Sequence, residues 1–505
     1  MSKTAKSEFT RLDGLRAAYL TRAEKHAGFT LPRICPPSNY DSNRDSLTHD
    51  FQSVGAQSVN HLVNRLMLTL FAPSRPFMRL TLAREMLAQL VAAGTKPEAV
   101  ESALAEGEQQ ATAELDNRPI RPKLYELLAT LVIVGDGLMH LPKGDDEEAS
   151  VYNIRDYVQQ RTPAGRISTL IVRDKVLATD LTEPARVAYM ASGKRVLKDD
   201  DVVSVYHYVR RLAKNKLEET TWVEETQLPP DFTETYSDED CPWVSTAWHL
   251  KRGQHYGTSH VEDYSGDFAA LSALSEAQVK GAILASEFRW LVNPGGMTKP
   301  EDLQSSENGA ALPGVEGDVT LVANSKPGDL QVVRQIGEDY IRRIGHGFLL
   351  NSAMTRDAER VTAEEIRLQA MELETGLGGV YTRLALGLQA PLGRWLLDAV
   401  DVKLGGTQIK MRIVTGLDAL SRNGDLAALR AALADCAGLQ QLGEVAGELN
   451  LQAIISTIFI GHGIKADKYL KTAEQKSAEQ EQALANQAAT AGAEAAATNM
   501  SQPQQ

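Results

Sequence analysis

The fold is set by a stretch in the second half of the chain, where residues 328–366 read GDLQVVRQIGEDYIRRIGHGFLLNSAMTRDAERVTAEEI. Its first part has an apolar residue at every third or fourth position, which predicts one face of an α-helix. These residues are Val333, Ile336, Tyr340, Ile344 and Phe348. The period stops at 351–360, and Thr362-Ala363-Glu364-Glu365 is a capping box that satisfies free N–H groups of a new first turn. The stretch therefore predicts a helix, a short loop and a second helix.

The second helix is expected to be long, and Pro391 should kink it. In the loop between the helices, the charges of Arg356, Asp357, Glu359 and Arg360 cancel. This loop is either a salt-bridged cap or a loop that touches a polyanion without binding phosphate tightly, and the residues alone do not decide between the two. Because the stretch holds no catalytic constellation, it indicates a mechanical element rather than an active site.

A second mechanical feature lies just upstream. Residues 266–288 are expected to form a helix whose alanines and glycines permit close approach of a neighbour. Residues 290–327 then lose the helical period and are dense in turn signals, such as Asn293-Pro294-Gly295-Gly296, with a strand expected at Val319-Thr320-Leu321-Val322. The sequence therefore predicts a helix pair, 266–288 and 328–350, that carries a small β-containing module at its tip.

The rest of the chain divides into helical and β-rich sections. Helices are expected over 8–31, from Asp50 to Phe71, over 83–93 and 96–116, and from 121 into the apolar run before Gly135. Strands are expected through 138–250 and again at 410–414, with further helices after that. From Ala473 the chain is low-complexity and cannot form a packed core alone, so it is either a disordered tail or a solvated helix held by others.

Composition excludes several classes of protein. The chain has 505 residues, 43% hydrophobic and 24% charged, which is typical of a soluble globular protein with a sizeable core. A formal net charge of -13 argues against a surface that grips nucleic acid through its phosphates. Cys35, Cys241 and Cys436 lie far apart, and the N-terminus has no signal-peptide pattern, so synthesis in a reducing cytoplasm is expected. No run approaches the ~20 apolar residues of a membrane span.

The candidate chemical motifs are weak. Gly135-Asp136-Gly137 lacks the third glycine of a dinucleotide fingerprint, which favours a turn after a core helix. Ser192-Gly193-Lys194 lacks the upstream glycine of a phosphate-binding loop. His249, His255 and His260 are not spaced to place two imidazoles on one helix face. We therefore expect no nucleotide, metal or other cofactor and no catalytic residues.

Several ordered motifs give the chain a resemblance to a known family. The motifs that carry this resemblance are Leu350-Asn351-Ser352-Ala353, Glu359-Arg360-Val361-Thr362-Ala363-Glu364-Glu365, Leu377-Gly378-Gly379-Val380-Tyr381, Gln389-Ala390-Pro391-Leu392, Ser53-Val54-Gly55-Ala56 and Leu291-Val292-Asn293-Pro294-Gly295-Gly296. With them the chain closely resembles, from about residue 8 to 465, the head-to-tail connector (portal) proteins of short-tailed, podovirus-type phages.

The resemblance implies an α+β, mainly α, portal-type fold assembled as a ring. It implies a wing, two stem helices, a clip at their tip, a channel loop and a crown. The implied ranges are 1–265 for the wing, 266–288 for stem helix 1, 289–327 for the clip, 328–350 for stem helix 2, 351–361 for the channel loop, 362–404 for a long kinked wing helix, 405–472 for the crown and 473–505 for the tail.

The resemblance also implies a function that is not enzymatic. The ring would be a homododecamer at one capsid vertex of the virion, through which double-stranded DNA is packaged, retained and ejected without sequence readout. Implied partners are the major capsid protein, scaffolding protein, terminase large subunit, tail adaptor protein and internal core proteins. The channel-loop residues implied to meet DNA are Asn351, Met354, Arg356, Asp357, Glu359 and Arg360. The alternatives are a structural adaptor or scaffold ring without DNA passage, and a hydrolase, against which the missing nucleophile and metal motifs count.

Overall fold

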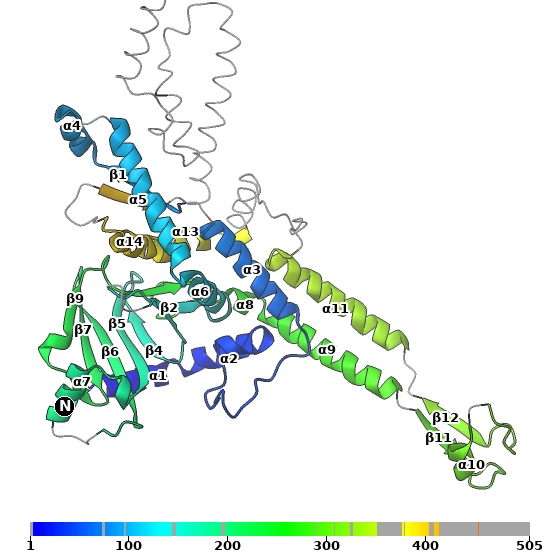
Figure 1. Ribbon diagram of the computed structural model, residues 1–505. Coiled ribbons are helices and arrows are strands. Elements are labelled where there is room, and N and C mark those ends of the chain that lie inside the picture. Colours follow the sequence, from blue (N-terminus) through cyan, green and yellow to red (C-terminus); the bar gives the residue numbers. More distant parts are fainter. Residues whose placement is uncertain are drawn as a thin grey trace, which may run out of the picture.

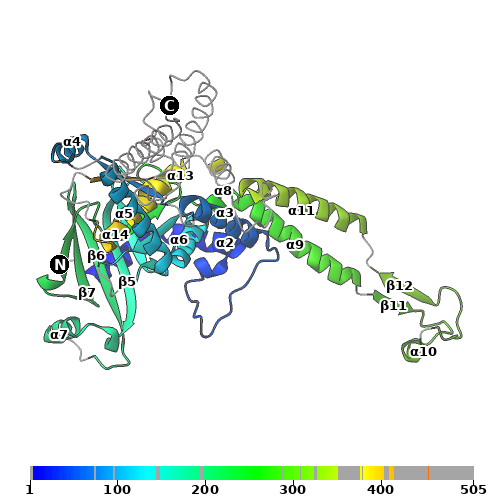
Figure 2. The ribbon, with the colours of Figure 1, turned by 45° about the horizontal axis from the view of Figure 1, so that its top comes forward.

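The computed structural model describes residues 4–72, 76–94, 97–143, 148–192, 197–286, 288–307, 309–323, 327–350, 376–377, 379–402, 409–413 and 453. The mixture of helices and strands expected from the sequence is confirmed within them. Figures 1 and 2 show a body from which a pair of long helices projects, with a small β module at the far end. The expected channel loop, the capping box at Thr362, the tail and most of the 405–472 region lie outside the described residues.

The helical segment expected over 8–31 is observed, and the structure divides it into two helices. Helix α1 (Ala5–Leu15) is separated from α2 (Ala17–Phe29) by Arg16. The Arg16 side chain is buried, and its Nη1 donates a hydrogen bond of 2.6 Å to the carbonyl oxygen of Ile154. A tertiary contact of a buried cation therefore breaks the helix, which the local apolar period does not reveal.

A buried helix, α6 (Ile120–Val134), lies at the centre of the body against α3 (Val54–Leu70). It ends at Gly135, whose φ of 95° is left-handed. A Cβ at Gly135 would lie 2.6 Å from the backbone nitrogen of Ser259, so this turn requires glycine. The turn expected after a core helix is confirmed. Two further helices, α4 (Arg84–Ala92) and α5 (Pro97–Asn117), extend from the body (Figure 1).

The largest sheet has six strands in the order β4-β5-β6-β7-β8, with β9 also paired to β7, and all of these pairs are antiparallel. The strands are β4 (Tyr157–Arg161), β5 (Ile167–Leu177), β6 (Val202–Ala213), β7 (Lys216–Val223), β8 (Thr226–Gln227) and β9 (Thr233–Tyr236). Leu170 and Val172 face the main core, whereas Ile171 between them packs with Phe9 of α1. Alternate residues of β5 thus lie on opposite faces of the sheet, and both faces are buried because α1 covers the face of Ile171.

Two smaller sheets connect distant parts of the body. Strands β2 (Asp136–His140), β3 (Ser150–Tyr152) and β10 (Trp243–Ala247) form a sheet in the order β10-β2-β3. Strand β1 (Met78–Leu82) pairs with β13 (Ile409–Ile413), which confirms the strand expected near 410. Helix α7 (Glu183–Ala191) interrupts the section that was expected to be β-rich. Short 3-10 turns lie at Pro32–Ile34 (η1), Ala178–Asp180 (η2) and Pro230–Phe232 (η3).

The helix expected to kink at Pro391 carries a one-turn π-helix just before it. Helix α13 (Val380–Leu384) runs into the π-helix η5 (Ala385–Gln389) and then into α14 (Ala390–Ala399). Pro391 has no N–H to donate to the carbonyl four residues earlier, that of Gly387. The hydroxyl of Thr246 donates to this carbonyl instead, at 3.1 Å. The freed carbonyl is therefore satisfied from β10.

A buried carboxylate joins β2 to the large sheet. Asp136 is fully buried and pairs with the guanidinium of Arg161 at 3.3 Å. Its oxygens also accept hydrogen bonds from the Tyr157 hydroxyl (3.1 Å), the Gln159 amide (2.8 Å) and the backbone N–H of Gly257 (3.3 Å). With these donors around it, the charge is satisfied inside the core. This role of Asp136 was not visible from the Gly135-Asp136-Gly137 pattern.

The projecting unit consists of α9 (Ser265–Ser286) and α11 (Pro327–Gly347), preceded by the short helix α8 (His260–Asp263). The tip holds strands β11 (Phe288–Val292) and β12 (Val319–Ala323) and helix α10 (Pro300–Ser305). The strand expected at 319–322 is confirmed, whereas β11 begins inside the expected helix 266–288. The projecting unit is called the helix pair below, and residues 288–323 are called the tip.

Candidate functional site

The six residues predicted to form the channel loop all lie outside the described residues. They are Asn351, Met354, Arg356, Asp357, Glu359 and Arg360. The described chain reaches Leu350, at the body end of α11, and resumes at 376. The candidate functional surface that the structure does describe is the helix pair that leads to this point, together with the tip.

The two helices of the pair pack closely along their length. A Cβ at Gly281 of α9 would lie 2.9 Å from Leu330 Cδ2 of α11, so the small residue permits this approach. Near the body, Arg343 of α11 pairs with Asp267 of α9 at 3.6 Å. The small residues expected on 266–288 thus act, at least at Gly281, in contact between the two helices of one chain.

The outer part of the pair exposes large apolar side chains. Six of these side chains are between 40% and 55% exposed, an exposure typical of surface positions rather than core positions. They are Val279, Ile283 and Leu284 of α9 and Val332, Ile336 and Ile341 of α11. Val332 and Ile336 are four residues apart and thus lie on one side of α11, and these two residues are called the open apolar face below. Large apolar side chains left in solvent on one side of a long helix indicate an interaction surface.

The tip is built around the carboxylate of Asp318. One oxygen of Asp318 accepts hydrogen bonds from the backbone N–H groups of Met297 (2.9 Å), Val315 (3.3 Å) and Thr298 (3.4 Å). The first two of these bonds hold the pKa of Asp318 below its ordinary value. A Cβ at Gly296 would lie against the same carboxylate, so a larger residue in this turn would displace the Asp318 side chain from its hydrogen bonds. A single side chain therefore ties two loops of the tip together.

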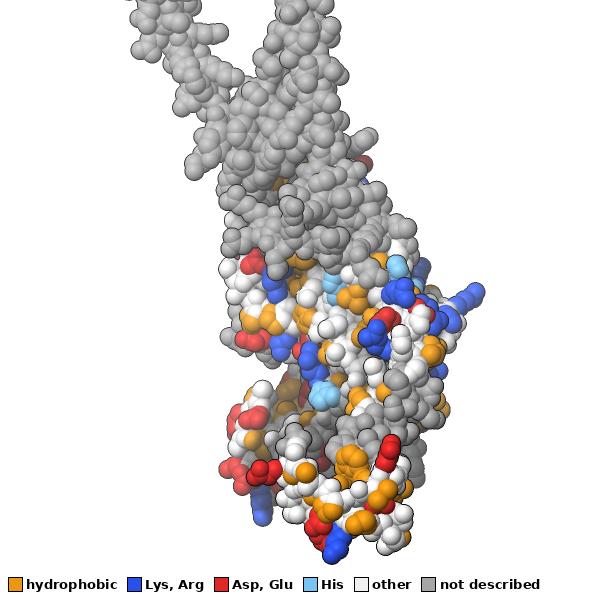
Figure 3. All heavy atoms as spheres, turned by 90° about the vertical axis from the view of Figure 1, so that its right-hand side faces the viewer, with side chains coloured by type: hydrophobic (Ala, Val, Ile, Leu, Met, Phe, Trp, Pro, Cys, Tyr) orange, Lys and Arg blue, Asp and Glu red, His pale blue; other side chains and the backbone are white. Residues whose placement is uncertain are grey.

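The tip also exposes apolar residues, as Figure 3 shows from the tip end of the molecule, where hydrophobic side chains lie among acidic and basic ones. The most exposed are Trp290, Leu291, Met297 and Val315. An isolated two-stranded hairpin is marginally stable in water. We therefore expect another protein surface to pack against β11 and β12 when this protein is assembled with its partners.

The charges described on the helix pair are balanced. Arg334 pairs with Glu338 (3.4 Å), Arg342 with Asp339 (2.5 Å) and Lys280 with Glu276 (2.6 Å). Each exposed pair contributes at most about 1 kcal/mol to stability. Paired cations neutralise few phosphates, so this surface does not favour tight binding of a polyanion.

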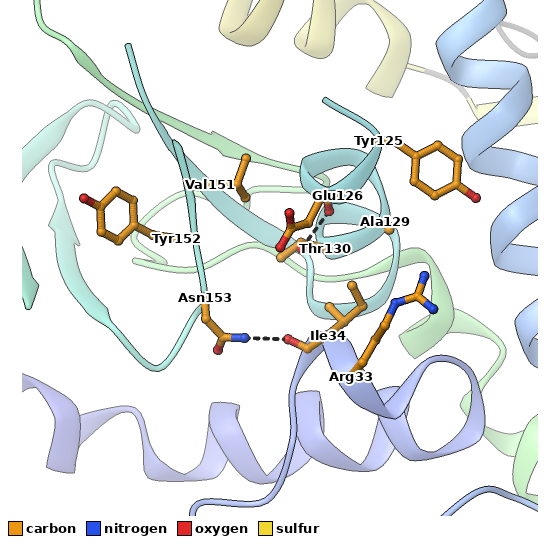
Figure 4. Close-up of a pocket in the computed structure, with 9 residues that line it drawn as sticks. All are labelled: Arg33, Ile34, Tyr125, Glu126, Ala129, Thr130, Val151, Tyr152 and Asn153. Carbon is orange, nitrogen blue, oxygen red and sulfur yellow. Dashed lines mark hydrogen bonds between the residues drawn. The ribbon is translucent and has the colours of Figure 1, made fainter. Parts of the chain in front are cut away.

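A small cavity of about 260 Å³ lies in the body between η1, α6 and β3 (Figure 4). Its polar groups connect these elements: the Asn153 amide donates to the Ile34 carbonyl at 2.9 Å, and the Tyr125 hydroxyl donates to Asn60 of α3 at 3.1 Å. Arg33 and Glu126 line it at the surface. These groups hold the fold together, and they do not form an arrangement of nucleophile, base and acid.

The three neighbouring histidines bind separate partners. The backbone of His249 pairs with that of Thr258, and Nδ1 of His255 accepts a hydrogen bond from the Arg161 backbone N–H at 3.1 Å. His260 donates to the carbonyl of Gly347 at 2.9 Å. Among the described residues, no group of three or more His, Cys, Asp or Glu is placed to hold a metal ion. Within the same residues, none of the helices has the length and apolar character needed to cross a membrane.

A projecting helix pair that leaves large apolar side chains in solvent indicates a protein that associates with other protein surfaces. The chain belongs to the bacteriophage head to tail connecting protein family, whose model matches residues 2–469. The family expected from the sequence motifs is therefore confirmed.

Relatives match over nearly the whole chain. The portal protein of Enterobacteria phage T3 is 33% identical, covering 99% of this chain and 95% of the relative. The portal protein of Escherichia phage T7 is 32% identical, covering 99% and 93%. That of Pseudomonas phage phiKMV is 31% identical, covering 91% of each. Among solved structures, a chain from the neck of an empty GTA particle is 14% identical with a TM-score of 0.38, over 75% of this chain and 86% of that one.

Proposed function

We propose that this chain is the subunit of a phage portal, a ring at one capsid vertex through which double-stranded DNA is packaged, retained and ejected. Membership of the connector family over residues 2–469 supports this function. The structural observation that carries it is the open apolar face of the helix pair. When such a face contacts a different surface of the next identical copy, repeated contacts close into a ring.

The proposed ring is a homododecamer, and the parts of the subunit have separate roles in it. The helix pair, α9 and α11, is the stem, and the tip is the clip that docks the terminase large subunit and later the tail adaptor protein. The body forms the wing together with the long helix of residues 362–404. Residues 351–361 form the channel loop, and residues 405–472 form the crown inside the capsid. The major capsid, scaffolding and internal core proteins are the further partners of the ring.

The balanced charges of the helix pair suit a conduit for DNA. Tight phosphate binding would hold the duplex in place, whereas a net charge of -13 and paired arginines favour passage without capture. Contact with DNA is through its backbone and shape, without base readout. The subunit is not an enzyme in this proposal, because ATP hydrolysis belongs to the separate terminase.

Electron microscopy of the purified full chain tests the proposal. Rings with a central opening wide enough for double-stranded DNA are expected. A protein that remains monomeric contradicts the proposal, and rings too narrow for DNA indicate an adaptor without DNA passage.

A pair of variants tests the surface that is proposed to assemble. Val332→Ser with Ile336→Ser should lower the fraction of subunits in rings at least tenfold, because it removes apolar contact area on α11. Gln331→Ser with Gln335→Ser is the matched control, since these exposed positions have the same spacing on the same helix. Normal ring yield from the first variant would show that the open apolar face is not the contact.

A further inference from the structure

The body end of α11 is fixed by side chains from two other helices. The last carbonyls of an α-helix have no partner within the helix and need donors from elsewhere. Here the carbonyl of Gly347 receives a hydrogen bond of 2.9 Å from Nε2 of His260, the first residue of α8. The carbonyl of Leu349 receives one of 3.2 Å from Nε2 of His61, in the middle of α3.

The direction of these hydrogen bonds follows from chemistry. A carbonyl oxygen only accepts, so each imidazole must carry its proton on Nε2. Burial lowers the pKa of His260, so at neutral pH this ring is uncharged and has a single N–H to give. The two Nε2–H groups therefore bond to the backbone at the end of α11 and just after it. They reach it from positions 87 and 288 residues away in the sequence.

Phe348, the residue between the two carbonyls, is fixed by packing. Phe348 is fully buried, and its ring lies edge-on to those of His260 (4.7 Å between centroids) and Phe268 of α9 (5.7 Å). A Cβ at Gly347 would lie 2.3 Å from the Tyr264 ring, so the backbone is pressed against the start of α9. Three successive residues, 347 to 349, are thus fixed by hydrogen bonding or packing.

The backbone at this point adopts an uncommon conformation. Leu349 has a φ of 59°, in the left-handed region that residues with a side chain seldom occupy. Such a conformation persists where surrounding contacts determine it. The His61 hydrogen bond to the Leu349 carbonyl is one of these contacts.

We propose that His61 and His260 are positioning residues that set the angle at which the helix pair leaves the body. The two imidazoles hold the end of α11 and the residues just after it through the carbonyls on either side of Phe348, and so connect the pair to both α3 and α8. In an assembled ring, this angle decides where the helix pair of each copy lies relative to the ring axis. That last consequence rests on the proposed function, whereas the angle is a property of the single chain.

Leucine and glutamine substitutions separate the hydrogen bond from the bulk of the side chain. His61→Leu with His260→Leu fills similar space but donates no hydrogen bond. His61→Gln with His260→Gln keeps an N–H at a similar reach. His26→Leu is the matched control, because His26 is a buried histidine of α2 in the same body. Unfolding in denaturant, measured for every variant, identifies general destabilisation.

The angle is measured as a distance within one full-length chain. Spin labels on noncanonical residues at Thr10 of α1 and Gln331 of α11, both exposed, avoid the natural cysteines. Labelled chains are mixed with an excess of unlabelled chains, so that only distances within a subunit are observed. A narrow distance distribution is expected for the native chain, His26→Leu and the glutamine variant, and a broadened or displaced one for the leucine variant.

Amide hydrogen exchange provides a second, local measurement. The N–H groups of Phe348 and Leu349 bond to carbonyls of the last turn of α11, so their exchange should be about tenfold faster or more in the leucine variant. An unchanged distance distribution in the leucine variant overturns the proposal. If the double variant does not fold, at least one single leucine variant must broaden the distribution, and failure of both to do so overturns the proposal equally. Because the angle is measured within one chain, an unchanged angle counts against this inference alone, whereas a native chain that forms no rings counts against the proposed function alone.

Discussion

The body and the helix pair use the same apolar spacing with opposite results. In α3, Leu62 and Leu66 are four residues apart and fully buried, whereas in α11 Val332 and Ile336 have the same spacing and are 55% and 42% exposed. Exposure decreases toward the body, where Ile344 of α11 and Phe348 just after the helix are both fully buried. A helical period therefore identifies an apolar face but does not say what covers it. In the body other elements of the chain cover it, and in the pair we propose that neighbouring copies do.

The largest expected contrast concerns ion pairs. Arg161→Met should lower the free energy of unfolding by about 3–5 kcal/mol, because it leaves the buried Asp136 carboxylate without its counter-charge. Arg343→Met, which breaks the exposed pair with Asp267, should lower it by about 0–1 kcal/mol. Urea unfolding of both variants measures the difference. Equal losses would show that the helix pair is as tightly integrated as the body.

Core truncation gives the next contrast. Leu66→Ala should lower the free energy of unfolding by about 2–5 kcal/mol, because it opens a cavity in the apolar core between α3 and α6. Ile336→Ala is the partner measurement and should change the unfolding free energy of the unassembled chain by less than about 0.5 kcal/mol. The comparison is made by denaturant unfolding below the concentration at which the chain assembles. A large loss for Ile336→Ala would mean that this residue is covered within one subunit.

Acid should weaken the body before the helix pair. Burial lowers the pKa of His26 and of His140 to about 4, and the folded pKa is thus below the unfolded value of 6.5. The unfolded chain then binds protons first, so stability present above pH 6.5 is lost progressively as the pH falls toward 4. Unfolding at pH 7 and pH 5 measures the part lost over this range, on the order of 2 kcal/mol for each histidine. His26→Leu with His140→Phe should flatten this dependence, and an unaltered slope would contradict the assignment.

The smallest expected effect lies at the π-helix. Thr246→Val should lower the free energy of unfolding by about 1–3 kcal/mol, because the Gly387 carbonyl loses the donor that replaces the missing N–H of Pro391. Thr10→Val, an exposed threonine of α1, is the control and should stay within about 0.5 kcal/mol. If the two substitutions have the same effect, the hydroxyl of Thr246 is not needed to satisfy that carbonyl.

Local signals in the sequence were sufficient for most elements. The apolar period found α3, α5, α6, α9 and α11, and alternation with turn residues found β5, β6 and β7. The break at Arg16 was missed because a tertiary hydrogen bond to Ile154 causes it. Helix α7 was missed although Thr182-Glu183-Pro184 carries a helix-start signal, with proline in its first turn and an acidic residue beside it.

The functional surface was harder to predict than the fold. Motifs identified the family, but the roles of His61, His260 and Asp318 depend on partners that no local pattern specifies. His61 meets a carbonyl 288 residues away, and Asp318 meets backbone groups 20 and 21 residues away. The only available signal was for Asp318, which follows Gly317 in a dense run of turn residues. The six channel-loop residues stay a prediction, since they lie outside the described part of the chain.

A reconstruction of the assembled full-length protein, with no rotational symmetry imposed, tests the central claim most directly. The account predicts a closed ring in which the helix pair of each copy packs against the next, so that Val332 and Ile336, now exposed, are buried between copies. A ring held together only by its bodies, with both residues still in solvent, would contradict it.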